Sequence, residues 1–145
     1  MLASERIVNG SYGELWENGE WQDNINAVTA EVTINKSALN LSGGRWQKHK
    51  ITSITGSGTI SGFKVSSNMI KQSQWVMDDQ AAPVSTEFLV YLKDPEAYGH
   101  ECVKLKGIKF DRVQLANWTA GQEVAEETPF TFEGYELVNE IVKGD

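Results

Sequence analysis

A long run of strictly alternating side chains near the N-terminus constrains the fold more than any other feature of the sequence. The alternation is regular from Val28 onward, within a strand expected over residues 24–36, and successive side chains of an extended strand point to opposite faces. The apolar face holds Val28, Ala30, Val32 and Ile34, and the other face holds Thr29, Glu31, Thr33 and Asn35. A strand over this range would span roughly 40 Å, about twice the usual length. We therefore expect one packed side, one hydrated side, and a strand too long for a single small domain.

A second alternating run has the same character. In the segment SITGSGTISGF, small polar side chains oppose a face of isoleucines and glycines. The polar face holds Thr55, Ser57, Thr59 and Ser61, and the other face holds Ile54, Gly56, Gly58, Ile60 and Gly62. Glycines inside a strand usually mark a bulge, a bend or a second backbone that approaches closely.

Shorter strands and one helix account for much of the remaining chain. Residues 12–17 form a predicted strand, and Asn18-Gly19 is the dipeptide that best fits a type I′ turn before the strand that returns from Glu20. A helix is predicted over residues 68–79, with Ser66 or Ser67 as its N-cap. Its core-facing stripe would be Met69, Ile70, Ser73, Val76 and Met77. Trp75 lies on the far side of that stripe, where it either tucks under a loop or forms a subunit contact.

The C-terminal half predicts further strands separated by loops. After a loop at residues 80–85, strands are expected at 87–93 and 100–115, with a bulge at Gly107. The acidic stretch around Glu123, Glu126 and Glu127 is predicted to be a solvated loop. The segment TPFTFEGYELV then forms the final strand, and residues 138–145 form a tail.

Residues 37–50 interrupt the alternation between the two long runs. This segment contains a Gly43-Gly44 pair and a basic cluster made of Arg45, Lys48, His49 and Lys50. We interpret it as a loop or a protruding arm. The 145 residues otherwise suit a single domain over residues 1–145.

Composition places the chain among ordinary folded proteins and excludes some function classes. Hydrophobic residues make up 40%, mean hydropathy is −0.38, and no apolar run approaches the ~20 residues of a membrane helix. The start, MLASERIVNG, lacks the basic and apolar regions of a signal peptide, so synthesis and folding in the cytoplasm are expected. A net charge of −7 disfavours tight binding of nucleic acid, which depends on Lys and Arg, but permits a surface past which DNA slides.

The sequence contains no convincing catalytic, cofactor or metal motif, so we expect the chain not to be an enzyme. His49 and His100 lie in a basic segment and at a turn, and no G-x-S-x-G, H-E-x-x-H, P-loop or G-x-G-x-x-G motif accompanies them. The single cysteine, Cys102, is expected to be a small apolar strand residue. Asp78-Asp79 is interpreted as a solvated helix end.

The long strands suggest assembly with other copies of the chain. Open strand edges invite uncontrolled pairing, and a ring of subunits that share one large barrel closes every edge. The hydrated faces would then line a lumen, with Thr29, Glu31, Thr33, Thr55, Ser57, Thr59 and Ser61 exposed to it. An equally compatible interpretation is that these faces are the outside of an ordinary β-sandwich.

Several segments, taken in order, resemble the tail tube (core tail) proteins of contractile phages and of phage-like defective prophages of Gram-positive bacteria. They are the N-terminal strand with its Asn18-Gly19 turn, the run NLSGGRWQKHKITSITGSGTISGFKVSS, the amphipathic helix that follows, and EETPFTFEGYELV. The resemblance covers nearly the whole chain. It implies a mainly β fold, a β-sandwich or barrel of antiparallel strands with one short helix, which forms a larger barrel in stacked hexameric rings inside a contractile sheath.

The resemblance also implies positions and partners. The inner barrel would be formed by the strands around residues 29–35, 55–61, 87–93 and 101–106. The arm would contact a neighbouring subunit or ring, and its basic residues would face acidic patches such as Glu123, Glu126 and Glu127. Expected interface residues are Arg45, Trp46, Lys48, His49, Lys50, Trp75, Glu126 and Glu127. Trp46 departs from the family pattern and would strengthen the docking of the arm.

The implied partners are other copies of the chain, a tail sheath protein, a baseplate and a tail terminator, with DNA only as a non-specific passenger. No cofactor, metal or stable membrane association is implied. The expected location is the tail of a virion or of a headless, bacteriocin-like particle, assembled in the host cytoplasm. The sequence leaves two alternatives open: a carbohydrate-binding β-sandwich, suggested by five tryptophans, and the tube of a type VI-like secretion system.

Overall fold

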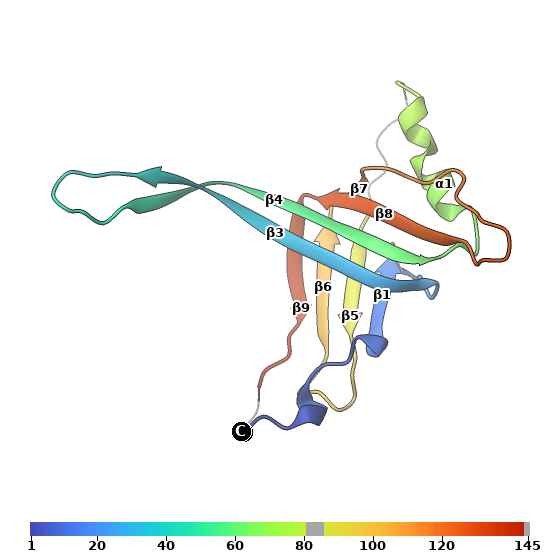
Figure 1. Cartoon of the computed structure of the whole chain (residues 1–145), viewed down its shortest axis with the longest axis horizontal. Helices are drawn as coiled ribbons and strands as arrows, with labels where there is room; N and C mark the ends of the chain where they lie inside the picture. Colours follow the sequence, from blue (N-terminus) through green and yellow to red (C-terminus); the bar gives the residue numbers. More distant parts are fainter. Residues whose placement is uncertain (81–85, 144–145) are drawn as a thin grey trace.

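The protein folds into two antiparallel sheets that pack face to face, and Figure 1 shows their strands crossing at a steep angle. The structure is a computed structural model that describes residues 1–80 and 86–143. The strands are β1 Gly13–Glu17, β2 Glu20–Trp21, β3 Ile25–Leu39, β4 Lys48–Phe63, β5 Phe88–Leu92, β6 Glu101–Lys106, β7 Lys109–Phe110, β8 Ala125–Phe132 and β9 Gly134–Asn139. The helical segments are η1 Ser4–Arg6, η2 Gly10–Tyr12, α1 Asn68–Ser73 and η3 Gln74–Met77.

The two sheets divide the chain unevenly. One has the strand order β2-β1-β5-β6-β9, and the other has the order β3-β4-β8-β7. The mainly β fold with one short α-helix that the sequence predicted is therefore confirmed. The resemblance grouped residues 87–93 and 101–106 with the two long strands, but β5 and β6 belong to the five-stranded sheet and the long strands to the other.

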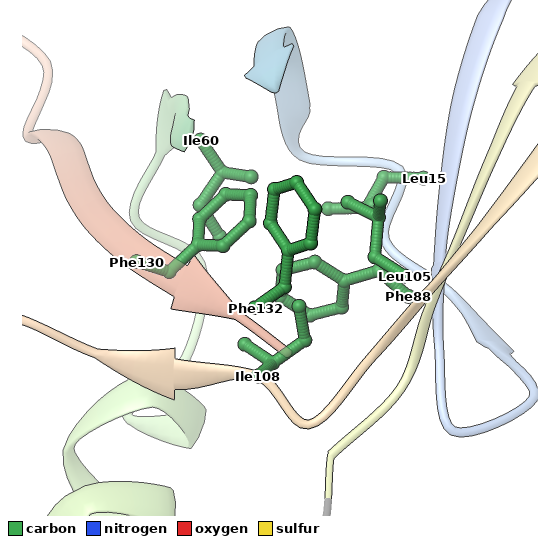
Figure 2. Packing of buried hydrophobic residues seen from close by; sticks show 7 residues of the cluster. All are labelled: Leu15, Ile60, Phe88, Leu105, Ile108, Phe130 and Phe132. Atoms are coloured by element: carbon green, nitrogen blue, oxygen red, sulfur yellow. The ribbon is translucent and has the colours of Figure 1, made fainter. Parts of the chain in front are cut away.

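Aromatic and branched side chains fill the space between the sheets (Figure 2). Phe88 from the five-stranded sheet meets Phe130 from β8 edge to face, with ring centroids 5.2 Å apart. The remaining members of the buried cluster are Leu15, Ile60, Leu105, Ile108 and Phe132. Because Ile60, Phe130 and Phe132 all point to this side, the apolar face of the β3-β4-β8 sheet is the face that packs.

The N-terminal hairpin confirms the predicted turn. Asn18 and Gly19 both have positive φ, at 50° and 87°, as a two-residue type I′ turn requires. Trp16 pairs with Trp21 across the short β1-β2 ladder. The predicted strand at residues 12–17 begins one residue later, at Gly13, because Tyr12 ends the turn η2.

The glycines inside β4 permit close approach, which was one of the three predicted explanations. A Cβ atom at Gly58 would lie 2.3 Å from the Thr29 carbonyl oxygen and 2.7 Å from the Phe130 ring. A Cβ atom at Gly56 would lie 2.5 Å from the Phe132 ring. The two core phenylalanines therefore lie directly over backbone that carries no side chain.

The prediction of a single strand over residues 100–115 with a bulge at Gly107 is wrong. The chain leaves the five-stranded sheet after β6 and joins the four-stranded sheet as β7, and Gly107 has a φ of 67° at this corner. β8 passes back into the other sheet as β9 beside it, so the final strand is also two strands. The Glu133 N–H donates to the Lys106 carbonyl oxygen at 2.8 Å, which joins the two crossings. The sequence does not reveal the change of sheet, because a bulge and a corner both shift the phase of the alternation at Gly107.

The segment interpreted as a loop or a protruding arm at residues 37–50 is mostly strand. β3 continues to Leu39 and β4 begins at Lys48, so only residues 40–47 connect them. β8 pairs with β4 only as far as Gly56, where its partner is Phe132. The rest of the β3-β4 hairpin is a two-stranded ribbon that projects away from the body of the molecule (Figure 1). We call residues 33–55 the arm.

The predicted helix is shorter than expected. Its regular part ends at Ser73, and a 3-10 turn carries the chain to Met77. Met69 packs against the core, but Val76 and Met77 are 64% and 81% exposed because the tighter turn rotates them away from it. Ser67 is the N-cap residue, although its side chain forms no capping hydrogen bond.

Two further predictions concern the segments near the C-terminus. Glu126 and Glu127 lie in β8 and not in a loop, because the strand begins at Ala125. The tail was predicted from residue 138, but Val138 and Asn139 belong to β9. The last two residues of that tail, and nearly all of the loop predicted at 80–85, lie outside the described residues.

Candidate self-assembly surfaces

The seven residues predicted to line a lumen lie together on the outer face of the four-stranded sheet. β3 and β4 pair Thr29 with Thr59, Glu31 with Ser57, and Thr33 with Thr55. Ser61 lies on the same face of β4, two residues beyond Thr59. We call these seven residues the polar face. Because their apolar neighbours on the same strands point into the core, the polar face is directed away from it.

The polar face is not covered by the other sheet. Thr29, Glu31, Thr33 and Thr55 are exposed, and Ser57, Thr59 and Ser61 are partly exposed. Asn35 extends the hydroxyl row by donating to Ser53 and Thr55 at 3.0 and 3.3 Å. Glu31 is the one charged residue among the seven. The face is therefore a hydrated wall of short side chains with little charge.

The arm carries apolar side chains that the body of this molecule does not cover. Ile34 pairs with Ile54 on the side of the ribbon that continues the core-facing surface, and they are 52% and 67% exposed. Ile51 is 59% exposed, and Trp46 in the connecting loop is 87% exposed. A two-stranded ribbon alone is marginally stable in water. The arm thus offers an apolar surface to a partner.

The basic residues of the arm are far from the acidic residues predicted to face them. The predicted interface residues of the arm are all exposed at the distal end of the hairpin; they are Arg45, Trp46, Lys48, His49 and Lys50. Glu127 pairs with Ser61 and Glu126 with Gly62, at the opposite end of β4. Lys50 and Ser61 belong to the same strand, eleven positions and roughly 36 Å apart. The structure does not bring these charges together within one chain, so the expected pairing requires a second copy.

Trp75 lies in a groove between the helical segment and the residues that follow β7. It is half-buried and shares the groove with Ile70, Phe110 and Leu115 among others. Ile70, Ser73, Val76 and Met77 of the predicted core-facing stripe line the same groove, so the groove does not separate Trp75 from that stripe. As an interface residue Trp75 stays a prediction.

Sequence reasoning missed a charged row that crosses the polar face. Glu31 pairs with Ser57, Ser57 with Thr131, and Thr131 with Lys109. The row begins with an acid on the edge strand β3 and ends with a base on the edge strand β7. The apolar residues that flank Lys109 gave a signal for a strand, but the assumed bulge at Gly107 concealed which sheet this strand joins.

Two titratable groups have perturbed pKa values. Burial raises the pKa of the Glu17 carboxyl, the Gln72 side chain partly opposes this effect, and the charge of Glu20 adds to it. The pKa of the Tyr91 phenol is raised, first through its contact with the Cys102 thiol on the neighbouring strand. Within residues 1–80 and 86–143 no cluster of three or more His, Cys, Asp or Glu side chains could hold a metal ion. In the same part of the chain no helix is long and apolar enough to cross a bilayer.

Solved structures with the same arrangement of sheets define the class of fold. A chain in the sheath-tube complex of the PVC extracellular contractile injection system superposes with a TM-score of 0.72 at 8% identity, covering 98% of this chain and 100% of that one. A chain in the cap of the anti-feeding prophage gives 0.72 at 7% identity over 97% and 96% of the two chains. A chain of the native gene transfer agent virion gives 0.63 at 13% identity over 90% and 98%. The protein therefore has the fold found in contractile injection systems and tailed particles.

Sequence comparison then identifies the family. The family model DUF2001, described as phage tail tube protein, matches residues 1–139. The XkdM protein of the phage-like element PBSX from Bacillus subtilis (strain 168) is 30% identical over 141 residues, which cover 97% of this chain and 96% of the relative. The YqbM protein of the same organism matches with the same identity and coverage. The chain belongs to the phage tail tube protein family, and it is a structural subunit of a tail tube.

Proposed function

We propose that copies of this chain form stacked hexameric rings whose polar faces line a central channel. The observation that carries the proposal is the uncovered polar face on a sheet that ends in a 15-residue edge strand. An edge strand of this length would pair without control unless neighbours close it. A ring places each edge against a neighbour and turns the hydrated faces inward. The channel serves either as a conduit for DNA or as a tube that punctures a membrane.

The arm joins each subunit to a neighbouring subunit or ring. Its apolar side continues the core-facing surface beyond the point where β8 ends, so a second copy of the chain would complete the packing. The basic residues at its tip, including Arg45 and Lys48, suit an acidic surface such as that around Glu126 and Glu127. That contact should weaken as salt is added if it stays exposed.

DNA would pass through the channel without being held. Retention of DNA depends on Lys and Arg side chains that displace counterions from phosphates. The polar face carries one carboxylate and six uncharged side chains, and the whole chain has a net charge of −7. A wall of this kind repels a polyanion weakly and offers no site at which it could stop. This arrangement supports a passenger role for DNA.

The remaining partners follow from the assemblies in which similar folds occur. The similar structures come from a sheath-tube complex, a sheath and tube terminator, and a baseplate. We infer that this chain likewise contacts a sheath protein, a terminator and a baseplate. We also infer a purely structural, non-enzymatic role and assembly in the host cytoplasm. The carbohydrate-binding and type VI alternatives have no such support.

Electron microscopy of the purified chain tests the proposal. We expect negative staining at high protein concentration to show rings or hollow filaments, with a baseplate extract added as a nucleus if the chain alone stays monomeric. The double variant Arg45→Ala with Trp46→Ala should fold normally, because both side chains are exposed, but should form no filaments. Unchanged filaments from that variant would remove the arm from the mechanism. Monomers under every condition would contradict the proposed function.

A further inference from the structure

The helix α1 is held against the body of the molecule by little buried surface. None of its six residues, Asn68–Ser73, is fully buried, and the N-cap residue Ser67 forms no capping hydrogen bond. Met69 packs against the hydrophobic core. The chain is fixed just before the helix, where the Lys64 N–H donates to the Val124 carbonyl oxygen at 2.8 Å. An element with so little burial belongs to the low end of local stability.

Three buried oxygen atoms lie where α1 meets the end of β1. Two are the carboxyl oxygens of Glu17 and the third is the side-chain oxygen of Gln72, and none of them has a hydrogen-bond partner within the described residues. The two side chains are close enough for Gln72 to affect the pKa of Glu17. Acceptors cannot satisfy one another, and each buried acceptor without a donor costs stability. The contact between α1 and β1 therefore lacks a donor.

The charged groups around Glu17 do not supply that donor. The cavity beside it is lined by three further acids, which are Glu20, Asp23 and Glu126. Lys71 on α1 also lines this cavity, but it is exposed and takes part in none of the salt bridges formed within the described residues. The surroundings are therefore mainly acidic, and a proton is the donor that can reach these oxygens without displacing the helix.

We propose that a proton shared between Glu17 and Gln72 holds α1 on the end of β1, and that ionisation of Glu17 releases the helix. We call this shared hydrogen bond the latch. The protonated carboxyl donates to the Gln72 side-chain oxygen, so one proton satisfies the hydroxyl and the amide oxygen together. With its amide group turned over, Gln72 could donate to one oxygen of an ionised carboxylate, and the other would stay without a donor. The latch lies within one chain and does not depend on the proposed ring.

The strength of the latch should change with pH in one direction. Burial raises the pKa of the Glu17 carboxyl while α1 covers it, and the charge of Glu20 adds to this rise. Once the helix is displaced, the solvated carboxyl returns to its ordinary pKa. The latch is therefore complete below the ordinary carboxyl pKa and weakens as pH rises through the raised value. Trp75 and Met77 follow α1 directly in the chain, so the same proton determines whether they keep a fixed place on the body.

Hydrogen exchange of single amides tests the latch in the wild-type chain. The Lys71 N–H donates to the Ser67 carbonyl oxygen at 3.0 Å, so its protection reports whether α1 is formed. After correction for the direct effect of pH on exchange, its protection should be lower at pH 8 than at pH 4, by about tenfold for each unit by which the pKa of Glu17 is raised. The amides of β6, which lies between β5 and β9, should be much better protected at both pH values.

The variant Glu17→Gln supplies a donor without a charge. Its side-chain nitrogen can donate to the Gln72 oxygen at every pH, so its Lys71 protection should agree within about twofold between pH 4 and pH 8. Glu123→Gln is the matched control, because Glu123 is exposed and is not among the groups that shift the pKa of Glu17. That variant should keep the wild-type dependence on pH. Thermal unfolding establishes that both variants fold.

The ionisation of Glu17 itself gives a readout that needs no substitution. The fall in Lys71 protection should level off at the pH where the chemical shift of the Glu17 carboxyl carbon shows ionisation. Protection that does not vary with pH, that varies over a different pH range, or that varies equally in Glu17→Gln overturns the latch. Equal protection of Lys71 and the β6 amides does so too, because α1 then opens only when the whole domain unfolds. These outcomes leave the proposed function intact, since electron microscopy tests it separately.

Discussion

Glu17 is an unusual residue for the inside of a small β protein. It ends β1 with 3% of its surface exposed, and neither carboxylate oxygen has a partner at hydrogen-bonding geometry, although the Gln72 side chain is near enough to oppose part of the rise in its pKa. The Gln72 side-chain oxygen on α1 is also buried without a partner. A buried polar group left unsatisfied costs about 1–3 kcal/mol. Glu17 therefore lowers the stability of the subunit in its ionised form.

Stability should depend on pH through this carboxyl. Its pKa is raised in the folded chain, so between the ordinary carboxyl pKa and the raised value the folded state holds a proton that the unfolded state has lost. The free energy of unfolding should fall as pH rises through that window and stay lower above it. Glu17→Gln should remove this dependence and raise stability at pH 8 by about 1 kcal/mol.

The measurement is thermal unfolding between pH 4 and 8, with Glu123→Gln as the matched control. Glu123 is an exposed carboxyl in the loop before β8, and it is not among the groups that shift the pKa of Glu17. Its substitution should leave the pH profile nearly unchanged. A Glu17→Gln variant that keeps the wild-type pH dependence would show that another group causes it.

Gly58 should tolerate no larger residue. A Cβ atom there would overlap the Thr29 carbonyl oxygen and the Phe130 ring, and a backbone atom cannot move aside easily. We expect Gly58→Ala to lower the free energy of unfolding by about 1–3 kcal/mol. Gly134→Ala is the control, because nothing lies within 4 Å of a Cβ at that position. Chemical denaturation of both variants would show the difference, and equal midpoints would contradict the close approach.

For single residues, the sequence predicted well which face of a strand each side chain occupies, and less well which other residues it contacts. The alternation placed Thr29, Thr59 and Ile60 on the correct sides, because burial imposes a period of two along each strand. It could not reveal that Glu17 is buried, since a carboxylate in an alternating strand ordinarily indicates the hydrated side. It also could not show which strand lies beside Lys109, because register between distant strands leaves no local signal.

At the scale of elements, the arm separates stability from assembly. Ile54 and Ile60 belong to the same strand, but Ile54 is 67% exposed and Ile60 is 1% exposed. Ile60→Ala should cost about 2–5 kcal/mol, and Ile54→Ala should change the stability of the monomer by less than about 0.5 kcal/mol. Ile54→Ala should nevertheless raise the concentration needed for filaments. Thermal unfolding and sedimentation of the two variants would test this contrast.

A stable Ile54→Ala variant that assembles like wild type would mean that the apolar side of the arm stays exposed in the assembly.

The strands, turns and helix were predicted with unequal success from the sequence. The long strands, the hairpin turn and the helix start were visible in the sequence, because each has a local pattern. The corners after β6 and β8 were not, since a bulge and a change of sheet shift the alternation in the same way. Residues 37–50 were left open between a loop and a protruding arm, because their apolar residues have no partner within the chain.

For the whole molecule, the channel predicts a size limit on access to the polar face. The native thiol of Cys102 is fully buried, so it should not react. A Thr29→Cys variant should react with small and large maleimides as a monomer. In filaments, the small reagent should still label it, and a reagent of about 5 kDa should not. Glu136→Cys, on an exposed residue of the other sheet, is the control.

Labelling of Thr29→Cys by the large reagent in intact filaments would place the polar face on the outside of the assembly. The sequence alone left this question open, because a hydrated face has the same composition whether it borders bulk solvent or an enclosed channel. Geometry within the subunit removes only one possibility, which is that the face is buried in its own core.

At Gly107 and at Glu133 the chain passes from one sheet to the other, and these two crossings lie next to each other. Here covalent chain, and not only side-chain packing, connects one layer to the other, and the Glu133 to Lys106 hydrogen bond ties the crossings together. A thrust applied along one layer would pass through peptide bonds into the second. If a tube is built from such units, its inner and outer layers cannot slide past each other at this margin, and it would transmit an axial push as a single solid wall.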